Sequence, residues 1–221
     1  MEIIKNVYQL DCSKGSHVFL IKSNDSVLID TGMPGQGSKI LSEIESLDVP
    51  VQAIKKILLT HHDVDHIGNA KKLQEATQAE LWAPEEDAPY IVGEKKRPGI
   101  KRILSTIIRP PRPLISHTYN ENHSFGEIQV IPAPGHTPGH SIILYKNVLF
   151  IGDLFKVMNG KFQLVPQFMN WDHEKAKNSI SIVKNLKYDW ICPSHGMPIQ
   201  RGAASEEFLK IFKTNKSLLL L

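Results

Sequence analysis

Histidine and aspartate side chains gather in one short segment of this 221-residue chain. His61, Asp63, Asp65 and His66 fall within six positions, directly after the apolar run Ile54–Leu59. Imidazole nitrogens and carboxylate oxygens are the ligands of zinc, iron and manganese in proteins. Unpaired, this much charge at the end of a buried strand would be costly to desolvate, whereas a divalent cation would compensate it. We therefore predict that this segment binds metal.

Three more candidate ligands follow later in the chain: His136, Asp153 and His195. Each lies among glycine, proline or other small neighbours, directly after an apolar strand-like run. Side chains in such positions are presented at the edge of a sheet, where clefts form. Any one of them alone would be a weak signal, but the ordered set indicates a shared metal site.

The elements that would position these residues alternate between strands and helices, which predicts the α/β class. Strands are expected at Ile3–Leu10, Val18–Ile21, Val27–Ile29, Ile54–Leu59, Glu80–Ala83, Glu127–Pro132, Ser141–Tyr145, Val148–Ile151 and Asp189–Cys192. Helices are expected at Ser38–Leu47, Ile67–Thr77, Asp172–Leu186 and Ala204–Phe212. No linker separates two parts, so we predict one domain over residues 1–221.

The segment from about residue 84 to 116 differs from the rest because it is rich in basic residues and proline. Ile100, Ile103, Leu104 and Ile107 recur in it at helical spacing. A lid over a site and a solvated surface excursion with one amphipathic helix explain this composition equally well.

Composition and charge exclude several classes of protein. The chain is 41% hydrophobic and 22% charged with a net charge of +3, which excludes disorder and offers too small a field to predict nucleic acid or membrane as partners. Cys12 and Cys192 do not make a disulfide framework, and the first residues lack the pattern of a leader. We therefore expect a cytoplasmic protein with a small-molecule substrate, and the sequence leaves its oligomeric state open.

The motifs together resemble the metallo-β-lactamase superfamily. The resemblance is carried, in the family's order, by Leu28–Gly32, Thr60–Gly68, Gly135–His140, Gly152-Asp153 and Ser194–Gly196. It implies an α/β fold of four layers, an αββα sandwich with two mixed sheets flanked by helices. It also implies a site for one or two metals along one edge of the sandwich.

Carried over residue by residue, the resemblance implies two metal positions. The first would be held by His61, Asp63 and His136, and the second by Asp65, His66 and His195, with Asp153 bridging both. Asp30 would support a turn near the site, and His140 would be a hydrogen-bonding partner rather than a ligand.

The first cluster departs from the family motif His-x-His-x-Asp-His. Asp63 stands where the second histidine is expected, and His62 is out of register by one position. We predict Asp63 as the ligand, with the alternative that His62 turns inward to bind and Asp63 accepts a hydrogen bond behind it.

The departure also affects the choice of metal. Two divalent ions carry +4 and the carboxylates of Asp63, Asp65 and Asp153 carry −3, so the site is one unit less positive than with histidine at position 63. Extra carboxylate favours harder cations, which makes manganese and iron candidates beside zinc. Zinc remains our first expectation for both ions.

From such a pair of ions we predict hydrolysis by a metal-bridged hydroxide. Asp65 could also orient this nucleophile or carry a proton. The short chain favours a small-molecule ester, thioester or lactone as substrate, and disfavours β-lactamase activity proper. One alternative is a mononuclear iron oxygenase of the sulfur-dioxygenase type. The other is a non-catalytic metal-binding protein, which seven candidate ligands disfavour because a structural site closes with four.

Overall fold

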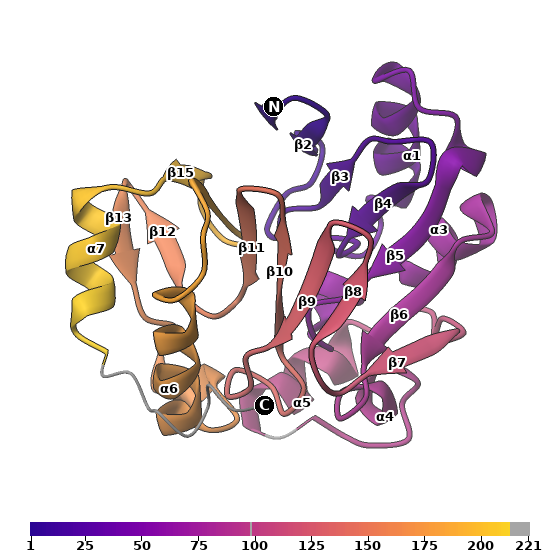
Figure 1. Cartoon of the computed structure of the whole chain (residues 1–221). Helices are drawn as coiled ribbons and strands as arrows, with labels where there is room; N and C mark the ends of the chain where they lie inside the picture. The colour runs from indigo at the N-terminus through magenta and orange to yellow at the C-terminus, as the bar shows by residue number, and fades with distance from the viewer. Residues whose placement is uncertain (98, 213–221) are drawn as a thin grey trace. The chain divides into compact units, whose positions relative to one another are not determined.

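A computed structural model describes residues 1–97 and 99–212, which fall into two compact units divided between Thr118 and Tyr119. Each unit is built on one mixed β-sheet with helices packed against it (Figure 1). The predicted α/β class of mixed sheets flanked by helices is confirmed. The single domain over residues 1–221 stays a prediction.

The first unit contains a seven-stranded sheet in which strand order follows chain order. Its strands are β1 (Glu2–Ile4), β2 (Val7–Gln9), β3 (Phe19–Ile21), β4 (Ser26–Ile29), β5 (Ile54–Leu58), β6 (Glu80–Pro84) and β7 (His117–Tyr119). β4, β5 and β6 run parallel, whereas β1 to β4 pair antiparallel. The helical elements of this unit are α1 (Gly37–Ser46), the 3-10 turn Val51–Ala53, α2 (Val64–Ile67), α3 (Ala70–Thr77), α4 (Ala88–Ile91) and α5 (Gly99–Ile107).

The apolar core of the first unit lies between the sheet and helices α1 and α3. Ile40 and Ile44 of α1 and Leu73 of α3 are fully buried against Leu28 and Ile57 of the central strands. Burying such side chains stabilises the unit by roughly 1.5–3 kcal/mol each, which holds the central parallel strands in place.

The second unit contains a six-stranded sheet in the order β15-β14-β11-β10-β9-β8 and a separate two-stranded hairpin, β12-β13. Its strands are β8 (His123–Phe125), β9 (Ile128–Pro132), β10 (Ser141–Tyr145), β11 (Val148–Gly152), β12 (Lys156–Met158), β13 (Lys161–Gln163), β14 (Trp190–Pro193) and β15 (Ile199–Gln200). Its helical elements are the 3-10 turn Gln167–Met169, α6 (His173–Val183) and α7 (Ala203–Lys210). Ile180 and Val183 of α6 and Leu209 of α7 pack against the sheet residues Ile142 and Leu149.

Two of the predicted elements are interrupted. The strand expected at Ile3–Leu10 is two strands, because the chain turns at Asn6, whose φ is 68°. The helix expected at Ile67–Thr77 is α2 followed by α3, with a break at Gly68 and Asn69. A side chain at Gly68 would collide with the backbone at Gly32 and Pro34, so only glycine permits this close approach.

Short polar elements escaped prediction. β7, β8, β12, β13, β15 and α4 each span two to four residues, which is too short to produce a periodic signal.

The segment from 84 to 116 forms α4, α5 and connecting loops, and the two interpretations of its composition stay open. Ile103 and Ile107 are exposed, whereas Lys101 on the same helix is buried. Pro98 lies outside the described residues, as do the side chains of Ile100 and Leu104.

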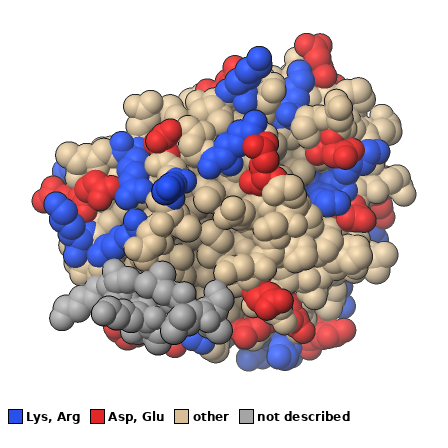
Figure 2. Space-filling model, viewed as in Figure 1, with Lys and Arg blue, Asp and Glu red and all other residues tan. Residues whose placement is uncertain are grey.

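Charge is mixed on the surface in view: Figure 2 shows basic and acidic side chains interspersed around a broad uncharged area. Among residues 1–97 and 99–212, no helix is both long enough and apolar enough to cross a membrane.

Candidate metal centre

The predicted ligands of the first unit follow the end of the central strand β5. β4 and β5 are parallel, so Asp30 after β4 and His61 after β5 come to the same edge of the sheet. Asp63 precedes α2, and Asp65 and His66 lie within it. The fold therefore brings His61, Asp63, Asp65 and His66 together within this unit.

Both histidines of this segment are held through Nδ1. His61 Nδ1 is 3.0 Å from Thr60 Oγ1, and His66 Nδ1 is 2.8 Å from Asp30 Oδ2. Asp30 also accepts hydrogen bonds from the Thr60 backbone N–H at 2.8 Å and from the Thr60 hydroxyl at 2.7 Å. This matches the expected supporting role of Asp30.

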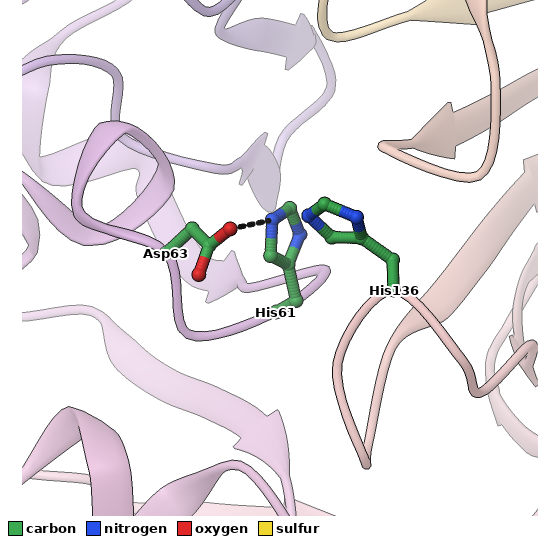
Figure 3. A group of neighbouring side chains, drawn as sticks. All are labelled: His61, Asp63 and His136. Atoms are coloured by element: carbon green, nitrogen blue, oxygen red, sulfur yellow. Dashed lines mark ion pairs between the residues drawn. The ribbon is translucent and has the colours of Figure 1, made fainter. Parts of the chain in front are cut away.

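The other ring nitrogen of each histidine faces a carboxylate. His61 Nε2 is 3.7 Å from Asp63 Oδ2, the pair marked in Figure 3, and His66 Nε2 is 3.8 Å from Asp65 Oδ2. His66 Nε2 also lies 3.3 Å from Ser16 Oγ. Two ligands of one tetrahedral zinc ion are about 3.4 Å apart, given metal–ligand bonds of about 2.0–2.2 Å. The spacing is thus close to that of ligand pairs.

The structure distinguishes His62 from Asp63. His62 Nδ1 is 3.0 Å from Asp87 Oδ2, and its ring stacks on Tyr90 with centroids 4.5 Å apart. The His62 backbone N–H also donates to Asp87 Oδ2 at 2.9 Å. His62 is therefore held by α4 and its preceding turn, and its Nε2 lies 3.6 Å from Asp63 Oδ1, while the other Asp63 oxygen lies beside His61 Nε2.

Two basic residues of the 84–116 segment contact the ligand-bearing segment, which sequence reasoning did not foresee. Lys101 Nζ is 2.6 Å from Asp63 Oδ2, and both side chains are about nine-tenths buried. Arg97 donates through Nε and Nη2 to the backbone carbonyl of His62. Burial lowers the pKa of Arg97, and this is opposed by the nearby charges of Asp63, Asp87 and Asp65. No spacing rule could have linked Lys101 to Asp63, since 38 positions separate them.

Lys101 changes the charge argument at position 63. An aspartate paired with a buried ammonium contributes no net charge, as a neutral histidine would.

The predicted ligands of the second unit lie on loops after three strands. His136 follows β9, Asp153 follows β11 and His195 follows β14. β11 and β14 are parallel. β9 runs in the same direction as β11, because both β9 and β11 pair antiparallel with β10. All three residues consequently come to one edge of the second sheet.

One oxygen of Asp153 lies between the two histidines of this unit. Asp153 Oδ2 is 3.5 Å from His136 Nε2 and 3.3 Å from His195 Nε2. The same carboxylate oxygen therefore faces the Nε2 atoms of both histidines.

Neutral groups hold these residues in place. His136 Nδ1 is 3.0 Å from Asn170 Oδ1, and the Asn170 amide is 2.9 Å from His173 Nδ1. His140 Nε2 accepts from the Asp153 backbone N–H at 3.0 Å, while its Nδ1 lies 3.1 Å from the Ala133 carbonyl. His140 is a hydrogen-bonding partner, as expected, and Asn170 was missed because nothing near it in the sequence marks it.

Comparison with known proteins identifies the family. Residues 14–195, which include all seven predicted ligands, match the model of the metallo-beta-lactamase superfamily, and the chain belongs to this superfamily.

Two curated relatives and one solved structure illustrate the range of similarity. The chain is 31% identical to the probable metallo-hydrolase YybB of Bacillus subtilis (strain 168), over 83% of this chain and 81% of that protein. It is 28% identical to a hydroxyacylglutathione hydrolase of Shewanella baltica (strain OS223), over 62% of this chain and 46% of that protein. The crystal structure of BJP-1, a subclass B3 metallo-beta-lactamase of Bradyrhizobium japonicum, superposes with a TM-score of 0.70 at 27% identity, covering 88% of this chain and 76% of that one.

Proposed function

We propose that this metallohydrolase of the metallo-beta-lactamase superfamily hydrolyses a small-molecule ester, thioester or lactone. It would do so with two bound divalent cations, for which zinc is our first choice. The observation that carries the proposal is the common orientation of its histidines. His61, His66 and His136 are each held at Nδ1, and all four predicted histidine ligands direct Nε2 at a carboxylate 3.3–3.8 Å away. Neighbours that fix one ring nitrogen typically prepare the other for a metal.

The donor set fits such ions. In the proposal, one cation is held by His61, Asp63 and His136 and the other by Asp65, His66 and His195, with Asp153 shared. The family match spans both groups of residues. Four imidazoles beside three carboxylates are a donor set that suits zinc.

When bound, a pair of divalent cations lowers the pKa of a water molecule held between them and polarises the bond under attack. In the proposed reaction, Asp65 orients this water and accepts its proton. Asp65 suits the role because its side chain is 21% exposed, compared with 11% for Asp63 and 8% for Asp153. It is thus the carboxylate most open to a substrate.

An acyl substrate is supported by the kinds of relative that the chain matches. One relative is named for the hydrolysis of hydroxyacylglutathione, although the match covers less than half of it. We place the protein in the cytoplasm, a proposal supported by the free thiols of Cys12 and Cys192. A small molecule remains its proposed partner.

Metal analysis combined with a substrate panel tests the proposal. The full chain would be produced without added metal, its metal content measured by mass spectrometry, and its activity assayed on esters, S-acyl thiols, lactones and a cephalosporin. We expect two zinc ions per chain and hydrolysis of one acyl class. One iron ion with oxygen consumption would replace the hydrolase by an oxygenase, and metal binding without turnover of any substrate would leave only a binding protein.

A further inference from the structure

The first unit contains a cavity of about 480 Å³ outside the predicted metal ligands. It is lined by α4, α5 and the loops that flank them (α4 and α5 in Figure 1). Its lining includes six basic residues, Lys95, Lys96, Arg97, Arg102, Arg109 and Arg112. A cavity of this size is typical of sites for small molecules.

The charge of this cavity differs from that of the rest of the chain. The whole chain carries a net charge of +3, so the six cations around the cavity leave a net −3 for all other residues. None of the lining residues that the structure describes is acidic. Several cations around one cavity create a positive potential that attracts an anion.

Arg97 connects the cavity to the ligand-bearing segment. Its side chain lines the cavity, yet the residue is only 9% exposed, because its guanidinium is bound to the His62 carbonyl. Guanidinium has five N–H donors in a rigid fork, and the carbonyl engages only Nε and Nη2. Tyr90, which also lines the cavity, stacks on the ring of His62.

The cations are also held close to the backbone. Gly93 has a φ of 76°, and a side chain there would collide with the Arg112 guanidinium, which therefore lies directly against this glycine. Lys95 Nζ lies 5.9 Å from the centre of the Tyr90 ring. Arg112 and Lys95 are thus placed against α4 and the turn after it.

We propose that this cavity binds a small polyanion, a ligand that carries phosphate groups or paired carboxylates. Arginine forks match the geometry of both groups, and charge-assisted hydrogen bonds to them are strong. The anion is either part of the hydrolysed substrate or a separate effector. Both sources would present the same anionic groups. The proposal goes beyond the proposed function, because the cavity is formed by residues that are not predicted metal ligands.

Calorimetric titration of the full-length protein with inorganic pyrophosphate tests the binding. The double variant Lys96→Gln/Arg112→Gln removes two exposed cations of the cavity, and Lys39→Gln/Lys55→Gln removes two exposed cations elsewhere in the same unit. We expect the first pair to weaken binding roughly 10- to 100-fold. We expect the second pair to leave binding unchanged. Equal loss in both variants, or no loss in the first, would overturn the proposal.

A third variant separates this cavity from the metal centre, since pyrophosphate also binds metals. His136→Ala removes a predicted metal ligand in the other unit, and pyrophosphate affinity is expected to persist in it. Affinity lost in His136→Ala but retained in Lys96→Gln/Arg112→Gln would assign the anion to the metal centre instead. Failure of the hydrolase proposal can be distinguished from failure of this one, because it would leave the calorimetric titration with pyrophosphate unchanged.

Kinetics then identify the source of the anion. If it belongs to the substrate, Lys96→Gln/Arg112→Gln raises KM for a phosphorylated ester and leaves KM for a neutral ester unchanged. If it is an effector, pyrophosphate changes the rate on the neutral ester in the parent protein but not in the variant. Either result supports the cavity as a polyanion site. If the protein hydrolyses these esters, the absence of both results would contradict the proposal.

Discussion

The first unit takes four predicted ligands from one segment after β5, whereas the second collects three from loops after β9, β11 and β14. Both present imidazole Nε2 atoms to carboxylates at similar distances. The groups that hold them differ. In the first unit, besides the neutral Thr60 hydroxyl, the supports are charged, with Asp30, Lys101 and Arg97 buried around the segment.

In the second unit the supports are neutral, namely the Asn170 amide, the His140 ring and the Ala133 carbonyl. The difference follows from charge density. Three acidic groups close together, Asp30, Asp63 and Asp65, require buried cations nearby, whereas a single Asp153 between two imidazoles does not. Removing a supporting group should accordingly lower metal affinity more in the first unit than in the second.

Removing the shared carboxylate should have the largest effect of all. Asp153→Ala is expected to lower kcat/KM by roughly three orders of magnitude or more, because both proposed cation positions lose a ligand. The bound metal should fall below two ions per chain, measured by mass spectrometry beside the exposed control Asp25→Ala. Full activity with two ions retained would show that the second unit does not share its carboxylate.

The next largest effect is expected from Asp30→Asn in the first unit. Asparagine tolerates the left-handed backbone at this position, where φ is 58°, but lacks the charge that orients His66. Metal affinity should fall roughly 10- to 100-fold, measured by competition with a chromophoric chelator. Unchanged affinity would show that the charged support is dispensable.

Lys101→Met tests whether the ammonium supports Asp63 or competes with a cation for it. We expect metal affinity to fall about tenfold, because Asp63 loses the partner that holds it at 2.6 Å. Lys39→Met is the control for an exposed lysine of the same unit. Tighter metal binding in Lys101→Met would mean that the ammonium occupies the place of a cation, and would reverse our interpretation of this pair.

Asn170→Ala in the second unit provides the neutral counterpart of Asp30→Asn. It removes the Nδ1 partner of His136 without removing a charge, so metal affinity should fall only roughly 2- to 10-fold. The same chelator competition measures both variants. A larger loss here than in Asp30→Asn would contradict the contrast between charged and neutral supports.

The smallest effect concerns the two thiols. Burial raises the pKa of Cys12 to about 12 and that of Cys192 well above its ordinary value of 9.0. A raised pKa in the folded state means that stability is fully present below about pH 9 and falls as the pH rises further, by up to about 1.4 kcal/mol per pH unit for one group. Urea unfolding between pH 8 and 10.5 should give a shallower decline for Cys192→Ala, and a lesser change for the half-buried Cys12→Ala. Parallel declines of unfolding free energy with pH in the parent protein and both variants would contradict this prediction.

Much of the fold was predictable because its main elements carry strong periodic signals. Strand β10 and helix α1 lie within a residue of their predicted bounds, since apolar runs and helical spacing reflect burial directly. Short polar strands such as β12 and β13 were missed, since their pairing depends on a partner rather than on their own composition. The seven metal ligands stay predictions. They were chosen because their motifs occur in the order typical of the superfamily.

The sequence by itself determined the α/β class, the superfamily and the chemical type of the candidate site, because ligand types and strand ends are local properties. Only the tertiary structure decided that His62 lies against Asp87 and Tyr90, that Lys101 pairs with Asp63 and that Asn170 holds His136. These contacts join residues 25 to 38 positions apart. Such pairs depend on how strands and helices pack, so no local pattern encodes them.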